Sequence, residues 1–107
     1  MRIYVDIDDT ICYYDSKFYG TGSKDYSLAL PYKDRIEKIN KLYDEGHKIV
    51  YWTARGTVTQ RFWFKITYEQ LVKWGCKFHE LKMGKPAYDL FIDDKNINSE
   101  KYFKSNE

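Results

Sequence analysis

The stretch that decides the fold stands near the start of the chain, where residues 2–10 read Arg-Ile-Tyr-Val-Asp-Ile-Asp-Asp-Thr. Residues 2–6 combine β-branched and aromatic side chains, a composition that predicts a short strand. Asp6 and Asp8 are two positions apart, so a continued strand would place both carboxylates on one face of the sheet. For both carboxylates to reach one site beyond the end of the strand, the chain must leave strand geometry directly after Asp6. We therefore predict a tight turn there, which the Thr10 hydroxyl could tie down.

The remainder of the chain alternates between helical and strand patterns. Apolar residues recur at helical spacing after Pro31 and again in residues 61–74. Short apolar runs predict three further strands, at residues 48–52, 77–81 and 88–92. Strands that alternate with helices are typical of α/β domains with a mostly parallel sheet, so we predict that fold class.

Length and composition narrow the class of protein. The chain has 107 residues, enough for one domain, which we expect to span residues 1–107. Its 18 basic and 16 acidic residues give a net charge of +2, which argues against nucleic acid or an acidic membrane as an electrostatic partner without excluding nucleic acid. We also expect no transmembrane helix and no signal peptide. Cys12 and Cys76 have no metal-type spacing, so we expect two free thiols in a reducing cytoplasm.

A tyrosine-rich segment, residues 12–30, separates the first strand from the first helix. Gly20 and Gly22 interrupt it, which predicts an irregular loop or a hairpin with a glycine turn. Closing an active site strengthens its electrostatics. We therefore expect this segment, or a neighbouring subunit of a homo-oligomer, to cover part of any site formed beside it.

Polar residues suited to chemistry follow three of the predicted strands. Asp6 and Asp8 follow the first strand, residues 53–55 (Thr-Ala-Arg) follow the second, and Asp93 and Asp94 follow the fourth. In a parallel sheet the carboxyl ends of the strands meet at one edge, so these carboxylates would crowd one site. Their mutual repulsion favours a bound cation, and oxygen-only ligands favour Mg²⁺.

The chain resembles the haloacid dehalogenase (HAD) superfamily of aspartate-nucleophile phosphatases. The resemblance rests on four motifs in the family's order: Asp6-x-Asp8-x-Thr10, Thr53 at the end of an apolar strand, Lys85, and the acidic pair Asp93-Asp94. Residues 53–56 and 84–86 further resemble the small capless phosphatases found beside capsule and surface-sugar biosynthesis genes. The resemblance implies a Rossmann-like, three-layer HAD core with a small, mostly parallel sheet and no cap domain.

The resemblance also implies a role for each motif residue. Asp6 would be the nucleophile that forms an aspartyl-phosphate, and Asp8 would protonate the leaving oxygen and then activate water. Thr53 would hydrogen-bond the transferring phosphoryl group, and Lys85 would neutralise its charge. This division fits phosphoryl transfer, which depends mainly on positioning and charge neutralisation. Lys82 competes with Lys85, but the glycine and proline that flank Lys85 fix its turn.

The implied cofactor is Mg²⁺. Its ligands would be Asp93, Asp94 directly or through water, Asp6, and the backbone carbonyl of Asp8. One departure from the family lies at Asp9, where many relatives carry glycine. That change could alter the turn or the surroundings of the metal, but it leaves the two catalytic carboxylates in place.

Three further residues are candidates for substrate contacts. The guanidinium of Arg55 suits a substrate phosphate or a sugar hydroxyl, and a structural salt bridge is an equal alternative. Thr10 is a second candidate because it stands next to the carboxylates. His79, late in the third predicted strand, could also face the substrate.

The resemblance implies a Mg²⁺-dependent phosphomonoesterase that acts on a small phosphorylated metabolite such as a sugar phosphate. Within the enzyme class, the alternative is a nucleotide or polynucleotide 3′-phosphatase, because those domains share the four motifs. From another class, the alternatives are a catalytically idle relative or a phosphoacceptor regulatory domain. Motif order counts against the phosphoacceptor, since there the lysine comes last, whereas here Lys85 precedes Asp93.

Overall fold

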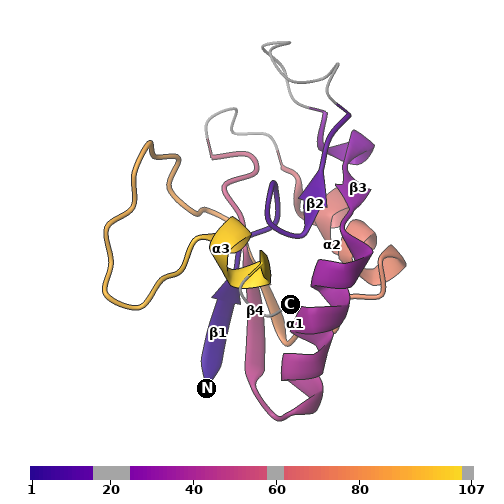
Figure 1. Cartoon of the computed structure of the whole chain (residues 1–107). Helices are drawn as coiled ribbons and strands as arrows, with labels where there is room; N and C mark the ends of the chain where they lie inside the picture. Colours follow the sequence, from indigo (N-terminus) through magenta and orange to yellow (C-terminus); the bar gives the residue numbers. More distant parts are fainter. Residues whose placement is uncertain (16–24, 58–61, 105–107) are drawn as a thin grey trace.

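In the computed structural model of the protein, three parallel strands form one sheet in the order β1-β4-β5. The strands are β1 (Arg2–Val5), β4 (Lys48–Trp52) and β5 (Glu80–Lys82). The structure describes residues 1–15, 25–57 and 62–104. Because the strands run the same way, their carboxyl ends lie at one edge of the sheet, at the top in Figure 1. The predicted α/β class with a small parallel sheet is confirmed.

The central strand and two helices build the core. Ile49, Val50 and Tyr51 of β4 are fully buried, as their uninterrupted apolar run predicted. Helix α1 (Lys33–Asp44) and helix α2 (Phe64–Lys73) pack their apolar residues, including Ile36, Ile39 and Leu71, into the same cluster as Ile49 and Tyr51. Gly46 follows α1 with a φ of +98°, a backbone conformation that suits glycine and ends the helix as predicted.

The expected third layer is not present in the described part of the chain. The connections β1-α1-β4 and β4-α2-β5 both advance in the same direction across the sheet. Right-handed crossovers, the nearly universal hand, then place both helices on one face. Residues of both helices share one core cluster, which agrees with this placement. On the other face Tyr4 remains 44% exposed, so the described residues form two layers, with no cap domain among them.

A small hairpin stands above the carboxyl edge of the sheet (Figure 1). Strand β2 (Cys12–Tyr13) pairs antiparallel with β3 (Leu30–Pro31), and a 3₁₀ helix, η2 (Tyr26–Leu28), precedes β3. Of the two predicted forms for this segment, the hairpin is the one observed. Its expected glycine turn, with Gly20 and Gly22, lies outside the described residues.

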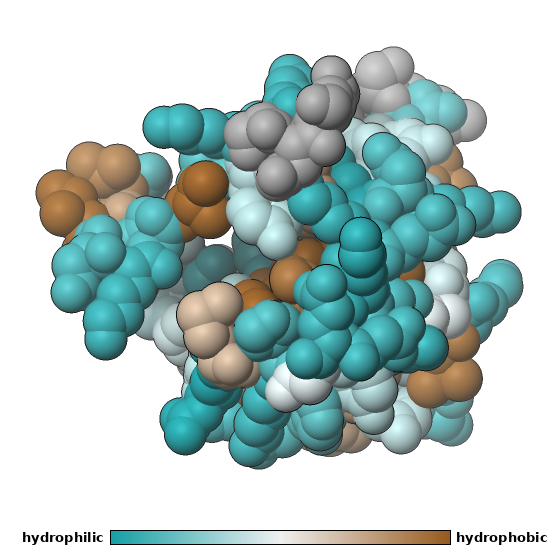
Figure 2. All heavy atoms as spheres, turned by 60° about the horizontal axis from the view of Figure 1, so that its bottom comes forward, coloured by the Kyte–Doolittle hydropathy of each residue, from teal (hydrophilic) through white to brown (hydrophobic). Residues whose placement is uncertain are grey.

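The predicted fourth strand, residues 88–92, is wrong: the segment is irregular and exposed. It belongs to the long connection between β5 and the last helix, drawn in orange at the left of Figure 1. Tyr88 and Phe91 pack on each other with ring centroids 5.1 Å apart, while Leu90 and Ile92 are 75% and 88% exposed. Hydrophobic atoms accordingly gather on the projecting lobe at the left of Figure 2. A strand needs a partner as well as β-forming residues, and no described strand pairs with this segment.

The last helix, α3 (Ser99–Lys104), docks beside the start of α1. Arg35 makes this joint: its guanidinium lies 4.2 Å from the Tyr32 ring centroid and 4.9 Å from that of Phe103. It also donates hydrogen bonds to the Thr10 carbonyl (3.1 Å) and to Glu100 (2.9 Å). One buried arginine therefore ties the C-terminal helix to the turn that follows β1. None of the described helices has the length and apolar character needed to cross a membrane.

The Arg35 joint predicts an unequal effect of two matched substitutions on stability. In Arg35→Met, the partly buried Thr10 carbonyl loses its donor, so we expect the free energy of unfolding to fall by about 1–3 kcal/mol. In Lys48→Met, the lost ion pair to Glu80 spans 3.6 Å between half-exposed side chains, so we expect a loss below about 1 kcal/mol. Urea denaturation measures both, and equal losses would contradict the role given to Arg35.

Candidate active site

The turn after β1 has the form that the Asp6–Asp8 spacing required. β1 ends at Val5, and the amides of Thr10 and Ile11 both donate to the Ile7 carbonyl, at 3.1 and 2.9 Å. Asp9 has a φ of +59°, in the left-handed region where glycine is at ease and aspartate is one of the few other residues tolerated. Aspartate therefore meets a backbone demand here that glycine would also meet.

Lys85, and not Lys82, stands beside Asp6. The Lys85 Nζ lies 3.6 Å from Asp6 Oδ2, and its side chain is only 14% exposed. Its backbone amide donates to the Thr53 carbonyl at 3.0 Å, and the Thr57 hydroxyl donates to its carbonyl at 2.9 Å. The Lys82 Nζ instead donates to the Tyr4 hydroxyl, at 3.4 Å. Three segments far apart in sequence thus meet at the end of β1 and β4.

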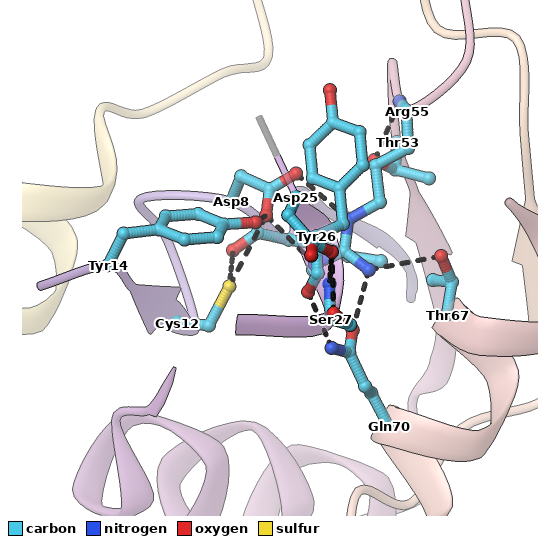
Figure 3. Close-up of polar contacts among 11 residues, drawn as sticks. Asp8, Cys12, Tyr14, Asp25, Tyr26, Ser27, Thr53, Arg55, Thr67 and Gln70 are labelled. Atoms are coloured by element: carbon cyan, nitrogen blue, oxygen red, sulfur yellow. Dashed lines mark hydrogen bonds and ion pairs between the residues drawn. The ribbon is translucent and has the colours of Figure 1, made fainter. Parts of the chain in front are cut away.

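Asp8 forms a two-pronged ion pair with Arg55 (Figure 3). Arg55 Nε donates to Oδ2 at 3.0 Å, and Nη2 donates to Oδ1 at 2.9 Å. The Tyr14 hydroxyl donates to Oδ1 at 2.6 Å, and the Cys12 thiol approaches it at 3.5 Å. The Arg55 side chain is fully buried and that of Asp8 is 17% exposed, so this is a desolvated pair.

Residues of helix α2 and of η2 contact the part of the Arg55 guanidinium that does not face Asp8. Arg55 Nη1 donates to the Thr67 hydroxyl at 3.0 Å and to Gln70 Oε1 at 2.6 Å, and its guanidinium lies 4.8 Å from the Tyr26 ring centroid. Gln70 in turn donates to the Tyr26 carbonyl at 2.6 Å. Of the two alternatives left open for Arg55, the salt bridge is the one observed. The sequence analysis missed Thr67 and Gln70; their only signal is a spacing of three, which puts two polar residues on one face of a helix.

The two carboxylates have opposite environments. Burial raises the pKa of Asp6, helped by repulsion from Asp8 and opposed by the nearby Lys85 ammonium. Burial would also raise the pKa of Asp8, but the hydrogen bonds and charge of Arg55, with the Tyr14 hydroxyl, outweigh it and lower that pKa. Carboxylates whose pKa values are pushed apart can take different roles in one reaction.

Of three other residues predicted to contact the substrate, two lie at the carboxyl edge of the sheet and one does not. Thr53 directly follows β4 and is buried, and its hydroxyl accepts a hydrogen bond from the Arg55 amide at 3.1 Å. Thr10 contributes its amide to the turn and its carbonyl to Arg35. His79 does not reach this edge of the sheet: its ring accepts from the Ile49 amide at 3.1 Å and stacks on Tyr43, beside the first half of β4.

Asp93 and Asp94 are not brought to the other carboxylates. Both are exposed, in the irregular segment that replaces the predicted fourth strand, where the Asp94 amide donates to the Asp93 carboxylate at 2.9 Å. Within residues 1–15, 25–57 and 62–104, no group of three or more His, Cys, Asp or Glu side chains is placed to hold a metal ion. In this arrangement the acidic pair therefore does not complete the implied metal site.

A small pocket opens beside the Lys85 turn. Its volume is about 210 Å³, and it is lined chiefly by apolar groups of residues 55–57, 62–63 and 83–84. Pockets for drug-sized ligands are larger, roughly 300–1,000 Å³. The space therefore suits a group of about one ring.

Comparisons with known proteins identify one structure with a similar fold. No family model matches the chain, and no curated protein matches it. The chain is similar to the crystal structure of an MCSG target from Vibrio cholerae, with a TM-score of 0.80 and 26% identity over 99% of this chain and 90% of that chain. A second protein thus shares the compact α/β arrangement over nearly the whole of both chains.

The opposite environments of the two carboxylates predict unequal losses of stability when each is replaced by asparagine. Asp8→Asn leaves the Arg55 charge buried without its counter-charge, so we expect a loss of about 3–5 kcal/mol in the free energy of unfolding. Asp6→Asn removes a carboxylate that is 37% exposed and loosely paired, so we expect a change below about 1 kcal/mol. Urea denaturation at neutral pH measures both.

The same pair gives a pH signature. A lowered pKa means that the Asp8 carboxylate contributes stability above its unfolded pKa, and this is lost as the pH falls through its folded value. The gap in stability between the wild-type protein and Asp8→Asn is therefore expected to close as the pH falls below about 4. A gap that stays constant into acid would contradict an ionised Asp8.

Proposed function

We propose that the protein is a HAD-type phosphomonoesterase that acts through an aspartyl-phosphate on Asp6. The observation that carries the proposal is the Lys85 ammonium, 3.6 Å from the Asp6 carboxylate where β1 ends. Asp8 stands two residues further along the same turn. A carboxylate nucleophile, a fixed cation and a second carboxylate are the parts that phosphoryl transfer to an aspartate requires.

The proposed reaction has two half-reactions. In the first, an Asp6 oxygen attacks phosphorus and the bond from phosphorus to the leaving oxygen breaks. The leaving oxygen takes a proton from Asp8, whose ionised carboxylate first accepts that proton from a singly protonated substrate phosphate. In the second, water attacks the aspartyl-phosphate, gives its proton to Asp8, and the bond between phosphorus and Asp6 breaks. Inorganic phosphate takes this proton as it leaves, and both carboxylates return to their ionised states. Lys85 and the Thr53 hydroxyl would face the phosphoryl oxygens.

Mg²⁺ belongs to the proposal because Asp6, Asp93 and Asp94 offer the oxygen ligands that it prefers. The described side chains do not form that site as they stand. Metal binding would require the segment that carries Asp93 and Asp94 to approach the end of β1. The ion would then add positive charge beside the transferring group.

The small pocket supports a small phosphorylated metabolite, such as a sugar phosphate, as the substrate. A volume of about 210 Å³ accepts a ring and leaves little room for a polynucleotide. The exposed, stacked rings of Phe62, Phe64 and Tyr68 lie beside the pocket and would favour a substrate with a flat ring. Nucleotides are therefore the second candidate.

Both cysteines are free, which is consistent with a reducing cytoplasm.

The nucleophile assignment predicts that Asp6→Asn abolishes turnover while the fold is retained, because the amide is nearly isosteric but cannot attack phosphorus. The measurement is phosphate release from nitrophenyl phosphate and from a panel of sugar phosphates and nucleotides, with Mg²⁺. Circular dichroism serves as the control for folding. Undiminished activity in a verified Asp6→Asn preparation would exclude Asp6 as the nucleophile. Stable phosphorylation of wild-type Asp6 without release would favour the phosphoacceptor alternative.

The metal assignment predicts that millimolar Mg²⁺ slows amide hydrogen exchange in residues 88–94 and raises the melting temperature, since a ligand that binds only the folded state stabilises it. In the double variant Asp93→Asn/Asp94→Asn, both effects are expected to disappear. Exchange in residues 88–94 that Mg²⁺ leaves unchanged would exclude these residues from a metal site.

A further inference from the structure

The donors around Asp8 are distributed unevenly between its two carboxylate oxygens. Oδ1 receives the Tyr14 hydroxyl at 2.6 Å, Arg55 Nη2 at 2.9 Å and the weak Cys12 thiol at 3.5 Å. Among the described residues, Oδ2 receives only Arg55 Nε, at 3.0 Å. A carboxylate oxygen has about two lone-pair positions, so those of Oδ1 are filled and one on Oδ2 is left.

We infer that Arg55 and Tyr14 are positioning residues which direct Asp8 to exchange its proton with leaving group and water through Oδ2 alone. The inference rests on the proposed function. The two-pronged pair fixes the plane of the carboxylate, because a guanidinium fork meets both oxygens at once. Tyr14 then fixes which oxygen is blocked. The Arg55 side chain is fully buried and its three donor nitrogens are all engaged, so the guanidinium would act through Asp8 and not on the reacting atoms.

The orientation of the Asp8 carboxylate depends on the residues of α2 that hold Arg55. Arg55 Nη1 is held by Thr67 and Gln70 on α2, so the guanidinium cannot turn without breaking those hydrogen bonds. Helix α2 thereby determines the orientation of a carboxylate that precedes it by more than 50 residues in the chain. This explains why a buried arginine, which costs desolvation energy, occupies the end of β4.

The test uses Arg55→Lys, which keeps the positive charge but replaces the fork by a single point donor. Activity is measured on an alkyl phosphate, whose leaving oxygen needs a proton, and on nitrophenyl phosphate, whose leaving oxygen needs little. General-acid help is worth about 10²–10⁴-fold. We expect kcat to fall by about 10²-fold on the alkyl phosphate and by less than about 10-fold on nitrophenyl phosphate, with KM nearly unchanged.

Two further variants keep the test decisive. Tyr14→Phe is nearly isosteric and is expected to change the ratio of the two rates in the same direction by a smaller factor; it decides the outcome if Arg55→Lys does not fold. Arg35→Lys alters another buried arginine, which holds the same turn through the Thr10 carbonyl, and is expected to leave the ratio unchanged.

The possible outcomes separate this inference from the proposed function. A wild-type protein without phosphatase activity would overturn both. An active wild-type protein with an unchanged ratio in Arg55→Lys and Tyr14→Phe would overturn the inference alone. A rise in KM on both substrates with kcat unchanged would also overturn it, because Arg55 would then bind substrate.

Discussion

The buried ion pair between Asp8 and Arg55 is the interaction on which the rest of the site depends. Removing both charges from water is costly, and the pair is tolerated because each nitrogen of the guanidinium and both carboxylate oxygens have hydrogen-bond partners. Those partners come from the turn after β1, from the hairpin and from α2. The pair therefore serves mainly to fix the orientation of Asp8 and Arg55, and contributes less as a source of stability.

The same pair shows what could and could not be predicted from the sequence. The strand before Asp6, the turn after it and the helices α1 and α2 are local features, and their patterns predicted them well. The preference for Lys85 over Lys82 also followed from the residues that flank it. The commitment of Arg55 to Asp8 could not be derived, because it depends on Thr67 and Gln70, which reach it only after the chain has folded.

The failed prediction of a fourth strand has a different cause. Residues 88–92 have the composition of a strand, but strand pairing is a relation between two segments, and one segment alone does not determine it. The absence of a paired strand at residues 88–92 also affects which face of the sheet the helices cover. With three strands advancing in one direction, both crossover helices fall on the same face, and a strand on the other side of β1 would be needed to reverse that direction.

The Arg35 joint and the Arg55 pair have a consequence for the order of folding. They connect residues that are 65 and 47 positions apart, whereas α1 and α2 form from neighbours in sequence. Long chain closures carry an entropic cost that is recovered only when their contacts form, so non-local contacts are made late. A partly folded chain would thus hold its helices and part of its sheet before the two carboxylates acquire their separate environments. The geometry of the candidate site would therefore be the last feature gained during folding.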